Sequence, residues 1–213
     1  MTLKEKAYAI IKERIINCVY APGTVLNEKQ IIAEIGVSRT PFREAATALK
    51  QEGFVQIVPR KGMYVSPITL KDISNLYEIR EVLEPKALEL AMERIPADIL
   101  KEYYGNMKAL QKVDNSMEEK EDLHKLILKY VDNALLEQML NDLYTSNHRL
   151  SFLCGRDAQN LLVTKGQHLR IAKRMVSGDK QAAMDAMVYH IKSSKERAMR
   201  YLHEQEGKLN IVL

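Results

Sequence analysis

The chain has 213 residues, of which 46% are hydrophobic, with 32 Lys and Arg against 28 Asp and Glu. That apolar content suffices to bury a core, which excludes wholesale disorder, and the length allows one large domain or two small ones. No apolar run approaches the roughly 20 residues of a membrane span, and the N-terminus lacks a signal-peptide core. We therefore expect a cytoplasmic protein with no membrane partner. Cys18 and Cys154 form no metal or redox pair, so reduced packing residues are expected there.

The net charge of +4 is concentrated in the first third of the chain. Residues 1–66 hold ten Lys or Arg and six Glu, whereas residues 67–213 hold 22 residues of each sign. A basic excess is expected of a module that binds a polyanion such as nucleic acid, although an ordinary solvated surface has the same balance.

The first 66 residues predict a winged helix-turn-helix domain. Gly36-Val37-Ser38 is a tight turn between two helical patterns, and Pro41 suits the first turn of the second one, where a missing N–H costs little. The expected elements are helices at about 3–17 and 28–35, a helix from Ser38 or Thr40 to before Gly53, and strands at 54–58 and 63–65.

The chain changes character near residue 66, where a Pro-containing stretch predicts a linker over residues 67–69. Long amphipathic patterns follow over 70–213 with short connections and no strand pattern, which predicts an all-α antiparallel bundle. The fold class is thus mainly α. Pro85 should kink or divide the first of these helices. They are expected at about 70–94, 97–112, 116–131, 133–153, 161–176 and 180–203.

The helix that starts near residue 39 carries the strongest signal for DNA reading. Arg39 and Arg43 are four residues apart and project from one face of its N-terminal end, with Thr40 beside them. This end of a recognition helix reaches base edges in the major groove, where the Arg fork bonds O6 and N7 of guanine. Two solvated arginines on an amphipathic helix are the alternative. The inward stripe is Phe42, Ala45, Ala46 and Leu49.

Three further stretches are candidates for DNA contact. Lys29 starts the preceding helix, where a side chain meets a phosphate. Arg60, Lys61 and Gly62 form the tip of the hairpin, and two cations beside a close-approaching glycine suit a minor groove or phosphates. An ordinary hairpin turn with solubilising charges is the competing interpretation.

The residues from Ala21 to Ala46 resemble the DNA-binding domain of GntR-type bacterial transcription regulators, most specifically in the run Gly-Val-Ser-Arg-Thr-Pro-Phe-Arg-Glu-Ala over 36–45 with Ala46. The helical remainder resembles the FadR-like ligand-binding (FCD) domain of that family. The resemblance implies a homodimer on a near-palindromic double-stranded operator, with an effector in a helical domain that also dimerises. It also implies DNA contacts at Lys29, Arg39, Thr40, Arg43, Lys61 and Gly62.

Three of the five histidines lie beside the apolar stripes of their helices: His124, His168 and His190. Three converging imidazoles make a site for zinc or another divalent transition metal. They resemble the metal-binding histidines of FCD regulators, which usually add an Asp one turn before the first His. Lys120 stands there instead, and Glu121 is the possible fourth ligand. Without a metal, Lys120 and the histidines would hold an anion directly.

Arg80 matches an arginine that faces the ligand in the resembling family, and Arg149 is a second candidate. Because Arg pairs bidentately with carboxylates, a small organic acid is the expected effector. A salt bridge from Arg80 to Glu84, one turn away, is the competing interpretation.

Two other functions remain open from the residues. One is a constitutive dimeric DNA-binding protein without an effector. The other is a hydrolase in which three histidines hold a metal, but HExxH, GxSxG, P-loop and dinucleotide motifs are all missing from the sequence. We therefore predict that the chain is not an enzyme.

Overall fold

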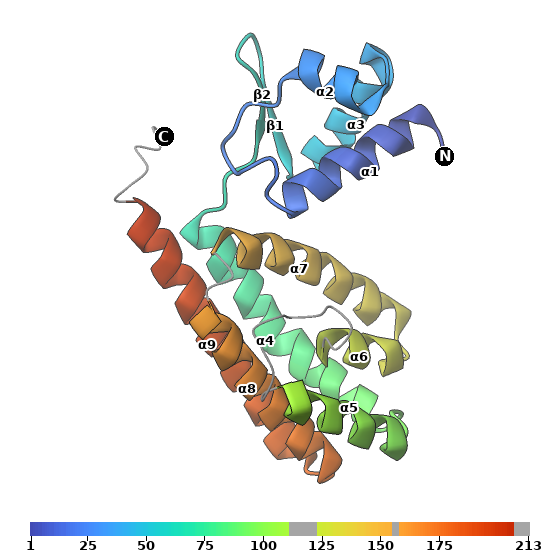
Figure 1. Cartoon of the computed structure of the whole chain (residues 1–213), viewed down its shortest axis with the longest axis vertical. Helices are drawn as coiled ribbons and strands as arrows, with labels where there is room; N and C mark the ends of the chain where they lie inside the picture. The colour runs from blue at the N-terminus through green and yellow to red at the C-terminus, as the bar shows by residue number, and fades with distance from the viewer. Residues whose placement is uncertain (111–122, 155–157, 207–213) are drawn as a thin grey trace. The chain divides into compact units, whose positions relative to one another are not determined.

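The computed structural model describes residues 1–110, 123–154 and 158–206 (Figure 1). They form two compact units, one of Met1–Thr69 with Thr145–Leu153 and one of Leu70–Tyr144 with Cys154–Leu213. The elements are α1 (Leu3–Ile16), α2 (Glu28–Ile35), α3 (Arg39–Gln51), β1 (Val55–Val58), β2 (Gly62–Val65), α4 (Leu70–Met92), α5 (Ala97–Leu110), α6 (Leu123–Tyr130), α7 (Ala134–Leu153), α8 (Ala158–Val176) and α9 (Lys180–Glu206). The predicted mainly helical fold class with a winged helix-turn-helix is confirmed.

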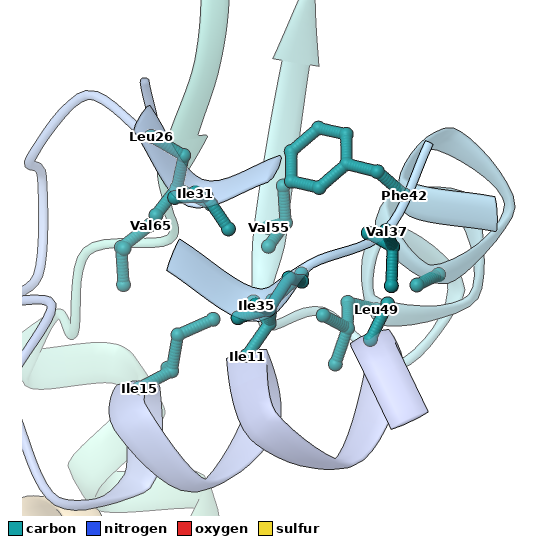
Figure 2. Close-up of a cluster of buried hydrophobic side chains, with 12 residues drawn as sticks. Ile11, Ile15, Leu26, Ile31, Ile35, Val37, Phe42, Leu49, Val55 and Val65 are labelled. Carbon is teal, nitrogen blue, oxygen red and sulfur yellow. The ribbon is translucent and has the colours of Figure 1, made fainter. Parts of the chain in front are cut away.

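A buried apolar cluster, drawn in Figure 2, holds the first unit together. Ala7, Ile11 and Ile15 are spaced four apart on α1, so they occupy one face, and all three are buried. They meet apolar residues of α2, α3 and both strands, including Phe42 and Leu49. Each fully buried side chain of this size stabilises the fold by about 1.5–3 kcal/mol. The inward stripe predicted for α3 is buried, which orients its opposite face outward.

The turn between α2 and α3 depends on one backbone conformation. Gly36 ends α2 with φ 67°, and its N–H bonds the carbonyl of Ile32 at 3.0 Å. Glycine takes this left-handed conformation without a Cβ penalty. Ser38 is the N-cap of α3, as one of the two predicted candidates, but its side chain makes no capping hydrogen bond.

The wing is a two-stranded antiparallel hairpin. Val55 pairs with Val65 and Val58 with Gly62, so a three-residue loop forms the tip. Arg60 has φ 63° and Gly62 has φ 118°. No atom lies within 4 Å of a Cβ built on Gly62, so its backbone angle, rather than crowding, favours glycine.

In the second unit, α4 packs against α9 and α6, and α8 packs against α9 and α5. Buried apolar residues at helical spacing, such as Ile73 and Leu88 of α4, supply the contacts. α4 runs undivided through Pro85, so the prediction that Pro85 divides this helix is wrong. The missing N–H removes one helix hydrogen bond, and the buried residues after Pro85 keep the helix packed.

Other helix bounds differ modestly from expectation. α8 begins at Ala158 rather than near 161, and α9 continues to Glu206. The expected start of a helix near 116 lies outside the described residues. Within the described ranges, none of the helices combines the length and apolarity that crossing a bilayer demands.

Candidate nucleic-acid interface and metal centre

The outward face of α3 presents the two predicted reading arginines. The side chains of Arg39 and Arg43 are 66% and 65% exposed. They stand one turn apart at the N-terminal end, opposite the buried stripe that anchors α3 to α1. A rigid helix thus offers two guanidinium forks on one side, as major-groove reading requires.

Both arginines share an acidic partner that the sequence did not reveal. Oε1 of Glu28, in the first turn of α2, lies 3.2 Å from Nε of Arg39 and 3.3 Å from Nε of Arg43. The Glu28 side chain is only 24% exposed, so its position is restricted. It therefore ties two long side chains into one arrangement before any DNA binds. Nothing in the spacing of 11 and 15 residues signals this contact.

The other predicted DNA contacts are also on the surface of this unit. Lys29, next to Glu28 on α2, is exposed, as is Thr40 on α3. Arg60, Lys61 and Gly62 are exposed at the tip of the wing. The Tyr64 hydroxyl donates to the Lys61 carbonyl at 3.1 Å and steadies that tip.

Replacing Glu28 by Gln tests its positioning role. Exposed ion pairs contribute about 0.2–1 kcal/mol each, so losing two should reduce the preference for operator over scrambled DNA about fivefold. Non-specific affinity should rise, because one negative charge near the phosphates is gone. Fluorescence anisotropy on a duplex selected from a random pool and on its scrambled version measures both.

Glu34→Gln is the matched control, since Glu34 lies on the same helix and pairs with Arg14 instead. It removes the same charge without touching the reading arginines. Equal preference ratios in the two variants would contradict a positioning role for Glu28.

Three histidines meet inside the second unit, as the sequence predicted. His124 comes from α6, His168 from α8 and His190 from α9, and their candidate ligand nitrogens all lie within 4.8 Å of one another. Nε2 of His168 is 3.3 Å from Nε2 of His190. Two nitrogens bound to one tetrahedral zinc at ordinary bond lengths are separated by about 3.3–3.4 Å. This pair therefore already has the spacing of metal ligands.

Neighbouring groups orient two of the three rings. Nδ1 of His124 is 3.0 Å from Oε2 of Glu84, and Nδ1 of His190 is 2.9 Å from Oε1 of Gln167. Each oxygen faces the Nδ1 side of its ring, and where Gln167 Oε1 accepts from Nδ1–H of His190, Nε2 of that ring keeps its lone pair. A carboxylate or amide oxygen behind a histidine is the usual support of a metal ligand.

Electrostatics favour the charge states that such a centre needs. Burial raises the pKa of Glu84, but the nearby Arg80 guanidinium and His124 outweigh it and lower that pKa to about 2. Burial, followed by electrostatic interaction with His168, His124, Arg80 and Arg197, lowers the pKa of His190 well below its ordinary value. Glu84 is thus a carboxylate and His190 a neutral imidazole, the form that binds metals.

The remaining predicted residues are placed differently. Arg80 and Glu84 are each 1% exposed and form a buried ion pair at 2.5 Å, so the salt-bridge interpretation holds for Arg80. Arg149 is buried in the first unit, where its guanidinium donates to the Ser66 carbonyl. Lys120 and Glu121 lie outside the described residues. Sequence reasoning missed Glu84 and Gln167 as partners of the histidines.

The winged helix-turn-helix, with two exposed arginines on α3, and the helical unit with its histidine cluster have the architecture of a DNA-binding transcription regulator with a separate helical domain. Residues 3–65 match the family of bacterial regulatory proteins called gntR, and residues 75–193 match the FCD domain. The chain belongs to the GntR family and carries a C-terminal FCD domain, which confirms the resemblance found in the sequence.

Relatives and solved structures agree with this assignment. The chain is 29% identical to the HTH-type transcriptional regulator YdhC of Bacillus subtilis, covering 95% of this chain and 93% of YdhC. It is 26% identical to the HTH-type transcriptional repressor RspR of Escherichia coli, covering 95% and 91%. The fold resembles that of a GntR transcriptional regulator from Rhodococcus sp. RHA1, with TM-score 0.72 at 18% identity over 92% and 97% of the two chains.

The metal-free FCD domain of TM0439 is a further structural neighbour, with TM-score 0.54 at 22% identity over 65% of this chain and 99% of that one. These proteins are transcriptional regulators rather than enzymes, so the chain is not an enzyme and the hydrolase alternative is wrong.

Proposed function

We propose that this transcription regulator binds a near-palindromic operator as a homodimer in the cytoplasm, and that a small carboxylate together with a divalent metal in the FCD domain changes its operator affinity. The observation that carries the proposal is the histidine centre, with three converging imidazoles and two of them oriented through Nδ1. Because these oriented imidazoles lie in a domain separate from the DNA-binding unit, the centre is suited to binding a ligand that the protein senses.

For DNA, the proposed base contacts are Arg39 and Arg43, with Thr40 beside them on α3. Lys29 is proposed to bind a phosphate, and Arg60, Lys61 and Gly62 of the wing to meet the minor groove or the backbone. Their exposure on one small unit supports these roles. In a homodimer, two such units must address half-sites one helical turn apart, which is why a near-palindromic operator is proposed.

In the FCD domain, His124, His168 and His190 are proposed to hold zinc or another divalent transition ion. Their nitrogens fit such an ion, because imidazole is a preferred ligand and the spacing of His168 and His190 suits a shared centre. When bound, the ion supplies a Lewis-acidic position that accepts a carboxylate oxygen. The Arg80–Glu84 pair would then act behind the site by holding His124 in place.

Effector control follows from a difference in affinity. A ligand shifts operator binding only by as much as it prefers one conformation of the dimer over the other. A carboxylate that favours one arrangement of the helical bundles therefore changes how readily both reading units engage their half-sites. The constitutive dimer is the alternative, in which neither metal nor carboxylate alters DNA affinity.

Metal removal tests the centre. Purified protein should contain about one zinc per chain, and chelation should lower Tm by about 5–11 °C, the effect of a ligand present at a hundredfold excess over Kd. His168→Ala should bind no zinc and show no response to added zinc. His203→Ala, which changes an exposed histidine of α9, should behave as wild type. If neither zinc nor any carboxylic acid moves Tm, the constitutive alternative is correct.

A further inference from the structure

Beyond the histidines, hydrogen-bonded polar side chains continue between α8 and α9. Nδ1 of His190 bonds Gln167, whose Nε2 donates to Oγ of Ser193 at 2.9 Å. Ser193 Oγ in turn accepts from Nη1 of Arg197 at 2.6 Å. A continuous path of hydrogen bonds therefore joins a proposed metal ligand to an arginine that the sequence analysis did not single out.

Within the described residues Arg197 has no anionic partner, unlike the buried Arg80. Its hydrogen bonds within the described chain go to three hydroxyl groups, those of Ser193, Ser194 and Thr164. A guanidinium has five N–H donors, so one on Nη1 and the one on Nε remain for another acceptor. By contrast, Arg80 is neutralised by Glu84. Arg197 is half-buried, and burial lowers its pKa.

The position of Arg197 relative to the histidines follows from helix geometry. Seven residues separate it from His190, so both project from the same face of α9, about 10 Å apart along the axis. The side chain turns back toward Ser193 and Ser194, which brings the guanidinium to within about one turn of His190. Its charge also acts on the His190 ring, which places the two groups in one electrostatic environment.

We propose that Arg197 is an anion anchor that pairs with the second carboxylate of a dicarboxylate effector whose first carboxylate meets the three-histidine centre. The inference rests on the proposed metal and effector site and specifies its ligand class. A guanidinium held by hydroxyls keeps its full charge for the ligand, and Arg pairs with a carboxylate through parallel N–H donors. Two anionic groups joined by a short carbon chain match the separation of about one helical turn.

Titration calorimetry on the zinc-loaded full chain tests the assignment, with succinate as the dicarboxylate and butyrate as the monocarboxylate of equal carbon number. Charge-assisted hydrogen bonds should make succinate bind about ten- to a hundredfold more tightly than butyrate in wild type. Arg197→Gln should bring the two affinities to within about twofold and leave that of butyrate unchanged. Arg200→Gln, at an exposed arginine of the same helix, should keep the full preference.

The assignment is overturned if wild type does not distinguish the two acids, or if Arg197→Gln keeps the preference. Should that variant fold poorly by circular dichroism, Arg197→Lys decides instead, because a point charge without the fork should retain only part of the preference. Failure of the metal proposal is separately visible as absence of zinc. In that case, the Arg197 proposal is supported if metal-free protein binds succinate and Arg197→Gln abolishes that binding. If metal-free protein shows no succinate binding that depends on Arg197, the metal proposal and the Arg197 proposal are both overturned.

Discussion

Replacing Arg39 and Arg43 together by Gln is expected to abolish sequence preference while leaving the fold intact. Each bidentate contact to guanine is worth about 1–3 kcal/mol of discrimination, so two per half-site should reduce the operator-to-scrambled ratio by a hundredfold or more. Stability should change little, because both side chains are about two-thirds exposed and their only ion pairs are with Glu28 within the described chain.

Fluorescence anisotropy at physiological salt, on the selected duplex and its scrambled version, measures this ratio. Lys50→Gln is the matched control, since Lys50 is an exposed cation in the last turn of the same helix. It should weaken binding to both duplexes alike, as loss of a phosphate contact does. The proposed DNA-reading role of α3 is wrong if the double variant still prefers the selected duplex as wild type does.

Replacing Glu84 by Ala is expected to produce the largest loss of stability. The change leaves the buried Arg80 guanidinium without its carboxylate, and breaking such a pair costs about 3–5 kcal/mol. Urea denaturation of chelator-treated protein should show this loss as a lower midpoint. His124 also loses the oxygen behind its Nδ1, so zinc affinity should fall about ten- to a hundredfold.

A second variant separates the two effects. Replacing Arg80 and Glu84 by Met and Leu together removes both charges, and apolar pairs of similar volume often replace buried ion pairs at little cost. Stability should recover most of the way toward wild type, whereas zinc affinity should stay low because the ring of His124 still lacks its partner. Recovery of both properties would show that Glu84 has no part in orienting the metal ligand.

Acid should weaken the wild-type protein through the same residue. The pKa of Glu84 is about 2 in the folded chain and near 4.5 when unfolded, so the unfolded state binds the proton more readily. Its stabilisation, about 3 kcal/mol from this shift, is complete above pH 4.5 and is lost as pH falls toward 2. The Met/Leu variant should lose correspondingly less stability over that range in chelator-treated protein.

Much of the DNA-reading unit could be predicted because its signals are local. The spacing of Phe42, Ala45 and Leu49 determines which face of α3 is buried, and so places Arg39 and Arg43 on the other face. Gly36 and the alternating strands mark the turn and the wing in the same way. Such periodicities depend on residues within a few positions of one another, and the backbone converts them directly into faces.

The three histidines of the centre were predicted from their positions beside apolar stripes, but the groups that support them were not. Glu84 lies 40 positions before His124, and Gln167 lies 23 before His190, so no short-range pattern relates them. The same holds for Glu28 and the reading arginines. The sequence left Arg80 open between an effector contact and a salt bridge with Glu84, and the buried ion pair with Glu84 forms where α4 packs against α9 and α6.

By itself, then, the order of residues determined the elements, their buried faces, the family and the residue types available for DNA and metal binding. Only the tertiary structure decided which charges neutralise one another and which remain available. Helix faces follow from spacing along one chain segment, whereas a charge partner depends on which segments become neighbours in space. That is why Arg80 and Arg197, both interior arginines of helices that pack together, differ in whether a carboxylate of the described chain meets them.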